Sequence, residues 1–243
     1  MNKKYFSALC AAVFAVGGVV PQVAEAVPYK AGVCAPIYIS VSDDEANGVV
    51  GFDYQADKCQ VVLKLKNGDK RILKFYGPNI FRVFQDPKGG VELRDPKAKP
   101  EARILVDNPT KPVGEMNVSE AGGNVVVKTS RVALTVNKTT ATIKVKDLKT
   151  GKTVVDELLP ASFEDGKVTL SLAAQNNEYF FGGGIQNGRF SHKGNAINIV
   201  NENSWTDGGV CSPAPFYWST NGYGFMAYTF KPGRYDFGSK EAD

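Results

Sequence analysis

The sequence has 243 residues, of which 43% are hydrophobic and 22% carry a charge. This composition is typical of a globular protein with one large domain or two small ones, and it excludes a chain that is disordered throughout. The formal net charge of +4 is too small, and its charges are too dispersed, to predict binding to nucleic acid.

Residues 1–26 have the pattern of a cleaved secretory signal peptide. Two lysines at positions 3 and 4 precede an apolar run over residues 5–20, and the small residues that follow end in Ala24-Glu25-Ala26. A membrane anchor is the competing interpretation, but the run is short, contains two glycines and meets Pro21. We therefore expect cleavage after Ala26, export to the periplasm or the cell exterior, and a mature chain that does not contact the membrane.

Cleavage at this position would leave three cysteines, Cys34, Cys59 and Cys211, in the mature chain. An oxidising compartment allows one disulfide, for which Cys34 and Cys59 are the first candidates, although spacing alone does not establish the pair. The sequence has no Cys-x-x-Cys pair and a single histidine, His192. An all-protein zinc site is therefore not expected, and neither is any other metal or cofactor.

Segments with period-two alternation of apolar and polar residues recur through the rest of the chain, and none has the apolar spacing of a helix. In the segment 61–76, VVLKLKNGDKRILKFY, two alternating runs flank Asn67-Gly68, the residue pair preferred in tight hairpin turns. Further strands are predicted at 79–85, 123–130, 131–137, 140–147, 152–157 and 167–173.

These strands predict an all-β fold in which residues 27–243 form one large antiparallel β-sandwich, because a parallel sheet would need crossover helices. Residues 86–112 are rich in proline, lysine and aspartate, and we expect them to form an exposed excursion between the sheets. Lys144, Lys146 and Lys152 are expected to mark a solvated or edge face rather than an anion site.

The glycine-rich segment 182–188, GGGIQNG, fits neither the dinucleotide-binding fingerprint nor a P-loop, and no helix follows it. Its glycines are better explained by the backbone conformations of a bend or a bulge. His192 lies between Ser191 and Lys193 in a polar stretch, so it is expected at the surface and not in a Ser-His-Asp triad.

The segment 203–225 carries the strongest functional signal. Trp205 and Asp207 are two residues apart, so an extended backbone would direct both to the same side. An indole can cover the apolar face of a sugar while a carboxylate accepts hydrogen bonds from its hydroxyls, and Gly208-Gly209 allows a sharp loop. The simpler interpretation, which spacing alone favours, places Trp205 in the core and makes Asp207 the cap of a turn. The following segment 215–220, PFYWST, is expected to be a core strand.

Three segments resemble the N-terminal β-sandwich of glycoside hydrolase family 31, the α-glucosidase and α-xylosidase family. They are EYFFGGGIQNGRFSHKG at 178–194, NENSWTDGGVCSPAPFYWSTNGYGFMAYTFKPGRYDFG at 201–238, and FYGPNIFRVFQDPKG at 75–89. The resemblance implies a galactose-mutarotase-like fold that precedes a (β/α)8 barrel, and that barrel supplies both catalytic carboxylates. Since nothing in this sequence matches the barrel motifs, we expect no catalytic residue in this chain and a catalytic barrel C-terminal to it.

In this family a loop of the sandwich reaches over the barrel's pocket, and an aspartate on the loop hydrogen-bonds the innermost sugar. The matching position is Asp207, with Trp205 beside it, so the resemblance implies that these two residues bind substrate. The segment GGGIQNGRF departs from the commoner family pattern, which places a glutamate soon after the glycines. In this respect it resembles members that act as transglycosylases or glucan lyases.

Three functions follow from these observations. The chain is expected to be the N-terminal domain of an exported α-glycoside-processing enzyme that hydrolyses O-glycosyl bonds, inactive by itself. The alternatives are a free-standing carbohydrate-binding module and a purely structural or adhesive β domain, which the fold alone does not separate from the first. The same fold could imply a mutarotase, an epimerase that uses histidines and a glutamate around the ring oxygen of the sugar. This function is disfavoured, because His192 is the only histidine in the sequence.

Overall fold

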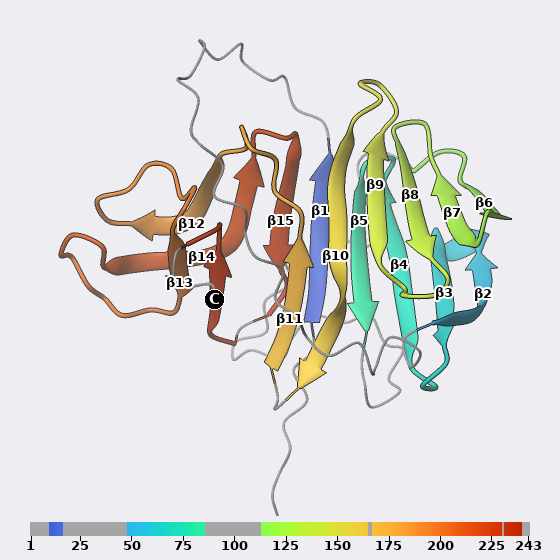
Figure 1. Cartoon of the computed structure of the whole chain (residues 1–243), viewed down its shortest axis with the longest axis horizontal. Coiled ribbons are helices and arrows are strands. Elements are labelled where there is room, and N and C mark those ends of the chain that lie inside the picture. Colours follow the sequence, from blue (N-terminus) through green and yellow to red (C-terminus); the bar gives the residue numbers. More distant parts are fainter. Residues whose placement is uncertain (1–9, 17–47, 86–112, 165–166, 230, 240–243) are drawn as a thin grey trace, which may run out of the picture.

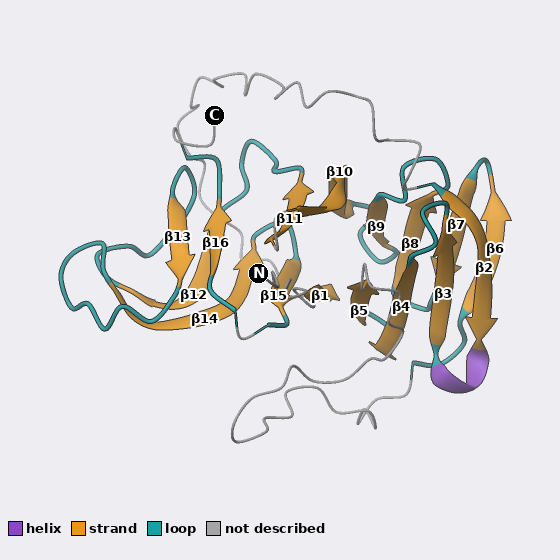
Figure 2. Cartoon of the chain, turned by 90° about the horizontal axis from the view of Figure 1, so that it is seen from below, coloured by secondary structure: helices purple, strands orange, loops and turns teal. Residues whose placement is uncertain are grey.

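The computed structural model describes residues 10–16, 48–85, 113–164, 167–229 and 231–239. Two antiparallel sheets pack face to face, and a two-stranded ribbon continues the second layer at one end (Figures 1 and 2). In the described part of the chain the helical content is one short 3-10 turn, Ala56–Lys58. The predicted all-β antiparallel sandwich is therefore confirmed.

The larger sheet has eight strands in the order β12-β14-β15-β1-β5-β4-β3-β2. These strands are β1 (Cys10–Val16), β2 (Val49–Gln55), β3 (Gln60–Leu65), β4 (Lys70–Gly77), β5 (Ile80–Gln85), β12 (Phe180–Gln186), β14 (Val210–Ser219) and β15 (Tyr223–Ala227).

The smaller sheet has six strands in the order β11-β10-β9-β8-β7-β6, and the ribbon pairs β13 with β16. These strands are β6 (Asn117–Ala121), β7 (Asn124–Lys128), β8 (Val132–Asn137), β9 (Ile143–Asp147), β10 (Thr153–Glu164), β11 (Lys167–Leu172), β13 (Ala196–Ile199) and β16 (Gly233–Asp236).

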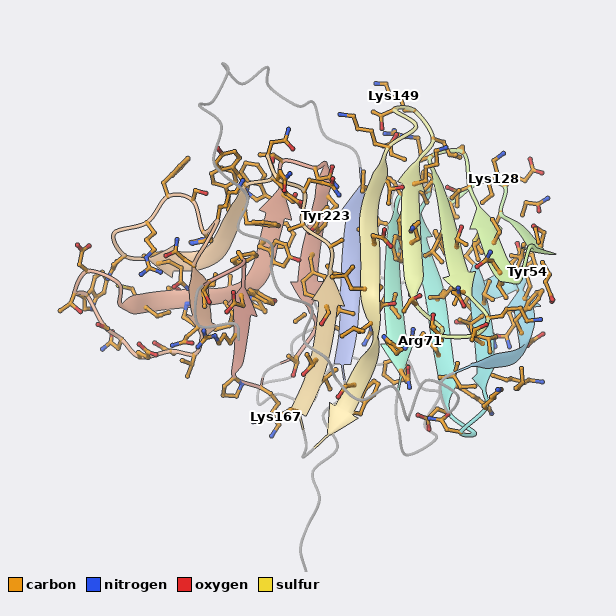
Figure 3. All side chains as sticks on the ribbon, viewed as in Figure 1. Tyr54, Arg71, Lys128, Lys149, Lys167 and Tyr223 are labelled. Atoms are coloured by element: carbon orange, nitrogen blue, oxygen red, sulfur yellow. The ribbon has the colours of Figure 1, made fainter. Side chains whose placement is uncertain are left out.

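The core lies between the two sheets and follows from the alternation of the strands. Because successive side chains point to opposite faces of a sheet, every second residue of β8 and β9 is buried and the others face outward. Lys128 and Lys149 project into solvent, whereas Arg71 and Tyr223 are buried (Figure 3). The most buried apolar residues are Val61, Leu63, Leu73, Phe81, Val125, Val127, Val132, Leu134, Val136, Ala141 and Val145.

The predicted hairpin at Asn67-Gly68 is confirmed, since β3 and β4 pair antiparallel around it, with Lys64 opposite Lys70. Gly68 has a φ of 88°, which glycine adopts without the steric cost that a Cβ would bring. The other predicted strands correspond to β5 and β7 to β11. Lys144 and Lys146 lie on the exposed face of β9, as expected, and Lys144 forms an ion pair with Asp156 at 3.1 Å.

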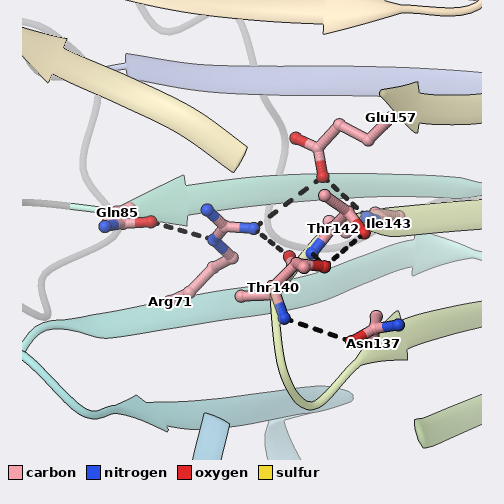
Figure 4. Close-up of polar contacts among 8 residues, drawn as sticks. Arg71, Gln85, Asn137, Thr140, Thr142, Ile143 and Glu157 are labelled. Carbon is pink, nitrogen blue, oxygen red and sulfur yellow. Dashed lines mark hydrogen bonds and ion pairs between the residues drawn. The ribbon is translucent and has the colours of Figure 1, made fainter. Parts of the chain in front are cut away.

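A buried polar cluster links the two sheets (Figure 4). Arg71 of β4 donates through Nη1 to the Ala141 carbonyl at 2.6 Å and through Nε to Gln85 Oε1 at 2.9 Å. Its Nη1 also lies 3.9 Å from Oε2 of Glu157, on β10. Burial lowers the pKa of Arg71 and raises the pKa of Glu157, and the opposite charge of each partner counteracts the shift. Removing either residue would therefore leave an uncompensated charge in the interior.

Strand β1 lies in the middle of the larger sheet and pairs antiparallel with β5 and with β15. Its backbone at Ala12 is opposite Val83 in β5 and Ala227 in β15. These residues belong to the segment 1–26, which the sequence predicts to be a signal peptide. Cleavage after Ala26 would remove this strand and leave the facing edges of β5 and β15 without it.

Two further expectations concern residues that the structure does not describe. The excursion at 86–112 and Cys34 both lie outside the described ranges. Cys59 and Cys211 are free thiols, so Cys59 forms no disulfide with a described residue. No helix within the described ranges is long and apolar enough to cross a membrane.

Candidate functional site

The candidate site lies at the end of the larger sheet where β12 and β14 extend past the six-stranded sheet (Figure 2). Residues 187–195 connect β12 to β13, and residues 200–209 connect β13 to β14. Both connections project from this end of the molecule (Figure 1). Trp205 and Asp207, the two residues predicted to bind substrate, are on the second connection, of which residues 201–209 are called the Trp205–Asp207 loop.

The glycines of β12 form a bend that brings its backbone against β14. Gly182, Gly183 and Gly184 have φ values of 116°, 74° and 80°, and the pairing register with β14 shifts at this point. A Cβ added at Gly182 would lie 2.7 Å from the Phe216 carbonyl oxygen, and one at Gly184 would lie 2.1 Å from the Ser212 carbonyl oxygen. The interpretation of GGGIQNG as a bend or bulge is therefore confirmed.

The β13–β16 ribbon covers the inner face of this bend. Ile197 of β13 belongs to the main core, and a Cβ on Gly183 would meet its Cδ1 at 2.3 Å. Gln186 connects the two elements, because its Nε2 donates to the Gly183 carbonyl at 2.9 Å and to the Asn198 carbonyl at 3.2 Å. A glutamate at this position could not donate either hydrogen bond, since an ionised carboxylate has no donor.

Trp205 and Asp207 are both exposed to solvent. The Trp205 side chain is 76% exposed, so the alternative that placed it in the core is wrong. Asp207 lies in a turn closed by a hydrogen bond from the Gly209 amide to the Thr206 carbonyl at 2.9 Å, so the premise of an extended backbone at this residue is also wrong. Within the described ranges the Asp207 carboxylate accepts no hydrogen bond, which leaves both its oxygens available to an added ligand.

Asn187, at the end of the β12 bend, is bonded to this loop and was missed by the sequence analysis. Its Nδ2 donates to the Ser204 carbonyl at 3.0 Å and to the Thr206 carbonyl at 3.1 Å. Its backbone amide donates to the Gly209 carbonyl at 3.0 Å, and its carbonyl accepts from the Gly208 amide at 3.1 Å. The signal that could have drawn attention to it is an Asn-Gly pair placed directly after a glycine bend.

Gly188 lies directly beneath the Asp207 carboxylate. A Cβ added at Gly188 would be 2.1 Å from Oδ1 of Asp207, so any other residue here would displace the carboxylate or the backbone. Gly188 also has a φ of 76°, which favours glycine independently of this contact.

His192 is buried, not at the surface as the sequence predicted. The residue is 2% exposed, its Nε2 donates to the Gly182 carbonyl at 2.9 Å, and its ring stacks on Phe237 with centroids 5.9 Å apart. The polar neighbours Ser191 and Lys193 led to the surface prediction. The connection folds back over the glycine bend, however, and this buries the imidazole. Within the described residues Nδ1 has no partner, so the imidazole stabilises the bend through one hydrogen bond and serves no triad.

Strand β14 alternates between the core and the outer face. Tyr217 and Ser219 are buried, whereas Phe216 and Trp218 are 42% and 46% exposed, so the prediction of a core strand at 215–220 is correct for one face only. Trp218 stacks on Phe181 of β12 with ring centroids 4.4 Å apart. The four outward aromatic side chains of this region, Phe181, Phe190, Phe216 and Trp218, are called the aromatic face below.

Phe190 is the most exposed member of the aromatic face. Its side chain is 86% exposed, and its ring meets Phe181 edge to face with centroids 5.2 Å apart. An apolar cluster of this size on a solvated sheet is typical of a surface that contacts another molecule. The outer face of β9, which carries lysines, shows the contrasting composition of a solvated sheet.

A buried carboxylate anchors the opposite end of the β12–β14 pair. Glu178 is 2% exposed and accepts hydrogen bonds from the Ser219 hydroxyl and, at 2.8 Å, from the Gln175 amide. Burial raises the pKa of Tyr217 and of Tyr223 in the same region, so both phenols stay protonated at neutral pH. These groups are structural, because they are enclosed by the core.

The cavities near the site do not enclose the predicted residues. A cleft of about 400 Å³ lies beside the start of the loop and is lined by Asn201, Pro213, Pro215, Met226 and Thr229, among others. A second cavity, between the sheets, borders Arg71 and Glu157. Neither is lined by Trp205 or Asp207, which project from the surface instead. Within the described residues no group of three or more His, Cys, Asp or Glu side chains could hold a metal ion.

Comparison with known proteins identifies the fold. Residues 71–236 match the family described as the glycosyl hydrolase 31 N-terminal galactose mutarotase-like domain. No curated protein matches the chain.

Solved structures of whole enzymes share the fold. A Flavobacterium johnsoniae GH31 dextranase in complex with isomaltotriose superposes with a TM-score of 0.71 and 18% identity, over 82% of this chain and 24% of the dextranase. The cycloalternan-forming enzyme from Listeria monocytogenes, in complex with a pentasaccharide substrate, superposes with a TM-score of 0.62 and 16% identity, over 81% of this chain and 18% of that enzyme. A GH31 α-xylosidase from Xanthomonas citri superposes with a TM-score of 0.54 and 22% identity, over 78% of this chain and 19% of the xylosidase. The chain thus spans a quarter or less of each of these enzymes.

The glycine bend generates a prediction about stability. Gly184→Ala is expected to lower the free energy of unfolding by roughly 3 kcal/mol or more, because the Cβ would collide with the β14 backbone. Gly208→Ala is the matched control, since Gly208 has a similar φ of 77° but nothing within 4 Å of the added Cβ, and it should cost only about 1–2 kcal/mol. Urea unfolding of both variants measures the difference, and equal losses would contradict the close approach of β12 to β14.

Proposed function

Because the chain belongs to the glycosyl hydrolase 31 N-terminal galactose mutarotase-like domain family, we propose that it is the N-terminal domain of an exported enzyme that processes α-glycosides. In this proposal the Trp205–Asp207 loop binds the substrate, while a catalytic (β/α)8 barrel C-terminal to the sandwich supplies both catalytic carboxylates. The observation that carries the proposal is the exposed Asp207 carboxylate, which has no partner within the described residues and is on the same loop as the exposed Trp205 indole.

The chemistry of these two side chains suits a saccharide. A carboxylate accepts charge-assisted hydrogen bonds from sugar hydroxyls, and an indole packs against the apolar C–H face of a pyranose ring. Neither residue lines the cavities described above. In this proposal the loop forms one side of the substrate site, and the catalytic domain supplies the other side. This half-site is the expected form of a domain that completes a pocket built mainly elsewhere.

The substrate class and the reaction type are inferred from the relatives. The dextranase was crystallised with isomaltotriose and the cycloalternan-forming enzyme with a pentasaccharide substrate, which supports an α-linked oligosaccharide as the ligand. We propose hydrolysis of its O-glycosyl bonds as the reaction. The alternative is an α-transglucosylase or glucan lyase reaction, which the departure of GGGIQNGRF from the commoner family pattern favours.

A free-standing carbohydrate-binding module is the second candidate. It is favoured by one observation, namely that hydrogen bonds from Asn187 of this chain hold the loop in place. Such a module would bind saccharide without a catalytic domain, whereas the half-site would bind it weakly or not at all.

Asp207 provides the test of the substrate-binding role. In the enzyme that contains this chain, Asp207→Ala is expected to lower kcat/KM for isomaltotriose by roughly 10- to 100-fold, because one hydrogen bond to a charged group is lost. Asp57→Ala, which removes an exposed aspartate on the 3-10 turn, is the control and should leave kcat/KM unchanged. An unchanged kcat/KM in Asp207→Ala would contradict the proposal. Calorimetric binding of isomaltotriose by the isolated chain, abolished in Asp207→Ala, would favour the module.

The aromatic face is the proposed contact with the catalytic domain. We expect the chain without that domain to self-associate as its concentration rises, since water disfavours an exposed apolar cluster of this kind. Sedimentation velocity measures the effect, and Phe190→Ser should reduce it. The matched control is Leu158→Ser, because Leu158 is a 60% exposed apolar residue on β10, in the other sheet. A chain that stays monomeric throughout the concentration series would count against this contact surface.

Export is proposed on the basis of the N-terminal sequence. The basic start, the apolar run and the Ala24-Glu25-Ala26 ending support cleavage after Ala26. We expect the protein recovered from outside the cytoplasm to begin at Val27, as measured by intact mass and N-terminal sequencing. A recovered protein that retains residues 10–16 would refute cleavage, and it would keep β1 between β5 and β15.

A further inference from the structure

Asn187 uses all of its backbone and side-chain hydrogen-bonding groups on one target, the segment 204–211. Four bonds join it to the loop, from the two protons of its amide nitrogen and from its backbone amide and carbonyl. Its Nδ2 and Oδ1 also lie 3.1 Å and 3.4 Å from the Cys211 thiol. That thiol is buried and donates in turn to the Ser204 carbonyl at 2.8 Å.

The loop's own hydrogen bonds do not attach it to β12. The Gly209 amide donates to the Thr206 carbonyl, the Ser204 amide donates to the Val210 carbonyl, and the hydroxyls of Ser204 and Thr206 lie 3.0 Å apart. All of these bonds join residues within the connection, or join the connection to Val210, the first residue of β14. Beside the pairing of Gln186 with Val210, and a bond from the Asn198 side-chain amide to Glu202 at 3.5 Å, the hydrogen bonds between the loop and the end of β12 within the described residues come from Asn187.

The two carbonyls that accept from the Asn187 amide bracket Trp205. Ser204 precedes the tryptophan and Thr206 follows it, so the backbone on both sides of the exposed indole is fixed. The next residue after Asn187 is Gly188, over which the Asp207 carboxylate lies. One Asn-Gly pair thus locates both residues of the proposed substrate site.

We infer that Asn187 is a positioning residue that holds Trp205 and Asp207 in a saccharide-binding arrangement before any ligand arrives. This inference rests on the proposed function for its ligand, but the positioning itself can be measured without one. Preorganisation of this kind lowers the entropic cost of ordering a loop on binding. The role requires an amide, because aspartate has the same shape but, when ionised, cannot donate to the two carbonyls.

The experiment measures how readily the loop opens in the full chain. Cys211 serves as the reporter, because its thiol is buried under the loop and opening of the loop would expose it to iodoacetamide. Because Asn187 itself contacts this thiol, deuterium exchange of the Ser204 amide, which donates to the Val210 carbonyl, is measured in the same variants. Alkylation at Cys211 is followed by peptide mass spectrometry, so the other cysteines do not interfere. The variants are Asn187→Ala and the isosteric Asn187→Asp.

Asn221→Ala is the matched control. The Asn221 amide likewise donates to two backbone carbonyls, those of Thr153 at 3.3 Å and Val154 at 3.1 Å, but it lies in the turn between β14 and β15. A variant at Asn221 therefore removes the same number of side-chain hydrogen bonds away from the loop.

We expect both Asn187 variants to raise the Cys211 alkylation rate roughly ten-fold or more, in line with the loss of two hydrogen bonds, and Asn221→Ala to leave the rate unchanged. The inference is overturned if Asn187→Ala behaves like Asn221→Ala, or if Asn187→Asp is as protected as the unmodified chain. The second of these results would mean that shape, not donation, matters.

Two further measurements complete the test. In the unmodified chain the Gly208 amide, which donates to the Asn187 carbonyl, should exchange with deuterium more slowly than the Asp207 amide. Equal rates would contradict the positioning of the loop by Asn187, even if the variants did not fold.

In the enzyme that contains this chain, Asn187→Ala should raise KM for isomaltotriose more than it lowers kcat. If alkylation is faster in Asn187→Ala but KM is unchanged in both Asn187→Ala and Asp207→Ala, the positioning role of Asn187 stands and the proposed substrate-binding function is refuted.

Discussion

The close approach of the β12 bend to β14 is the constraint on which the candidate site depends. It is possible because Gly182 and Gly184 have no Cβ where the carbonyls of β14 pass. The bend delivers Asn187 to the loop that follows β13, and His192 closes over it through a hydrogen bond to Gly182. A side chain on either glycine would separate the two strands and, with them, the residues that hold Trp205 and Asp207.

The rest of the sandwich gives this end of the sheet a rigid base. Apolar residues of the two sheets bury one another, and Arg71 and Glu157 connect β4 to β10 across the core. The two outer faces differ in kind, since β9 presents lysines to solvent while β12 and β14 present aromatic rings. This difference is the basis for the proposal that the aromatic face contacts a neighbouring domain.

Local patterns were enough to predict most of the strands, but not the site. The hairpin at Asn67-Gly68 and the alternation of β8 and β9 depend on nearby residues, so the sequence predicts them well. The burial of His192 and the exposure of Trp205 depend on the paths of the two connections that follow β12 and β13, which no periodicity encodes. Asn187 and Thr206 are 19 residues apart in sequence, and their hydrogen bond follows from the bend rather than from spacing. Asp207 was singled out by its spacing from Trp205, resemblance to a family strengthened that hypothesis, and its role as a ligand to sugar stays a prediction.

The proposed saccharide site at Asp207 and Trp205 can be tested by a crystal structure of the enzyme that contains this chain, bound to isomaltotriose. We expect a sugar hydroxyl at about 2.5–2.7 Å from an Asp207 carboxylate oxygen and a pyranose ring in contact with the Trp205 indole. A bound saccharide with no atom in contact with either residue would contradict the proposal.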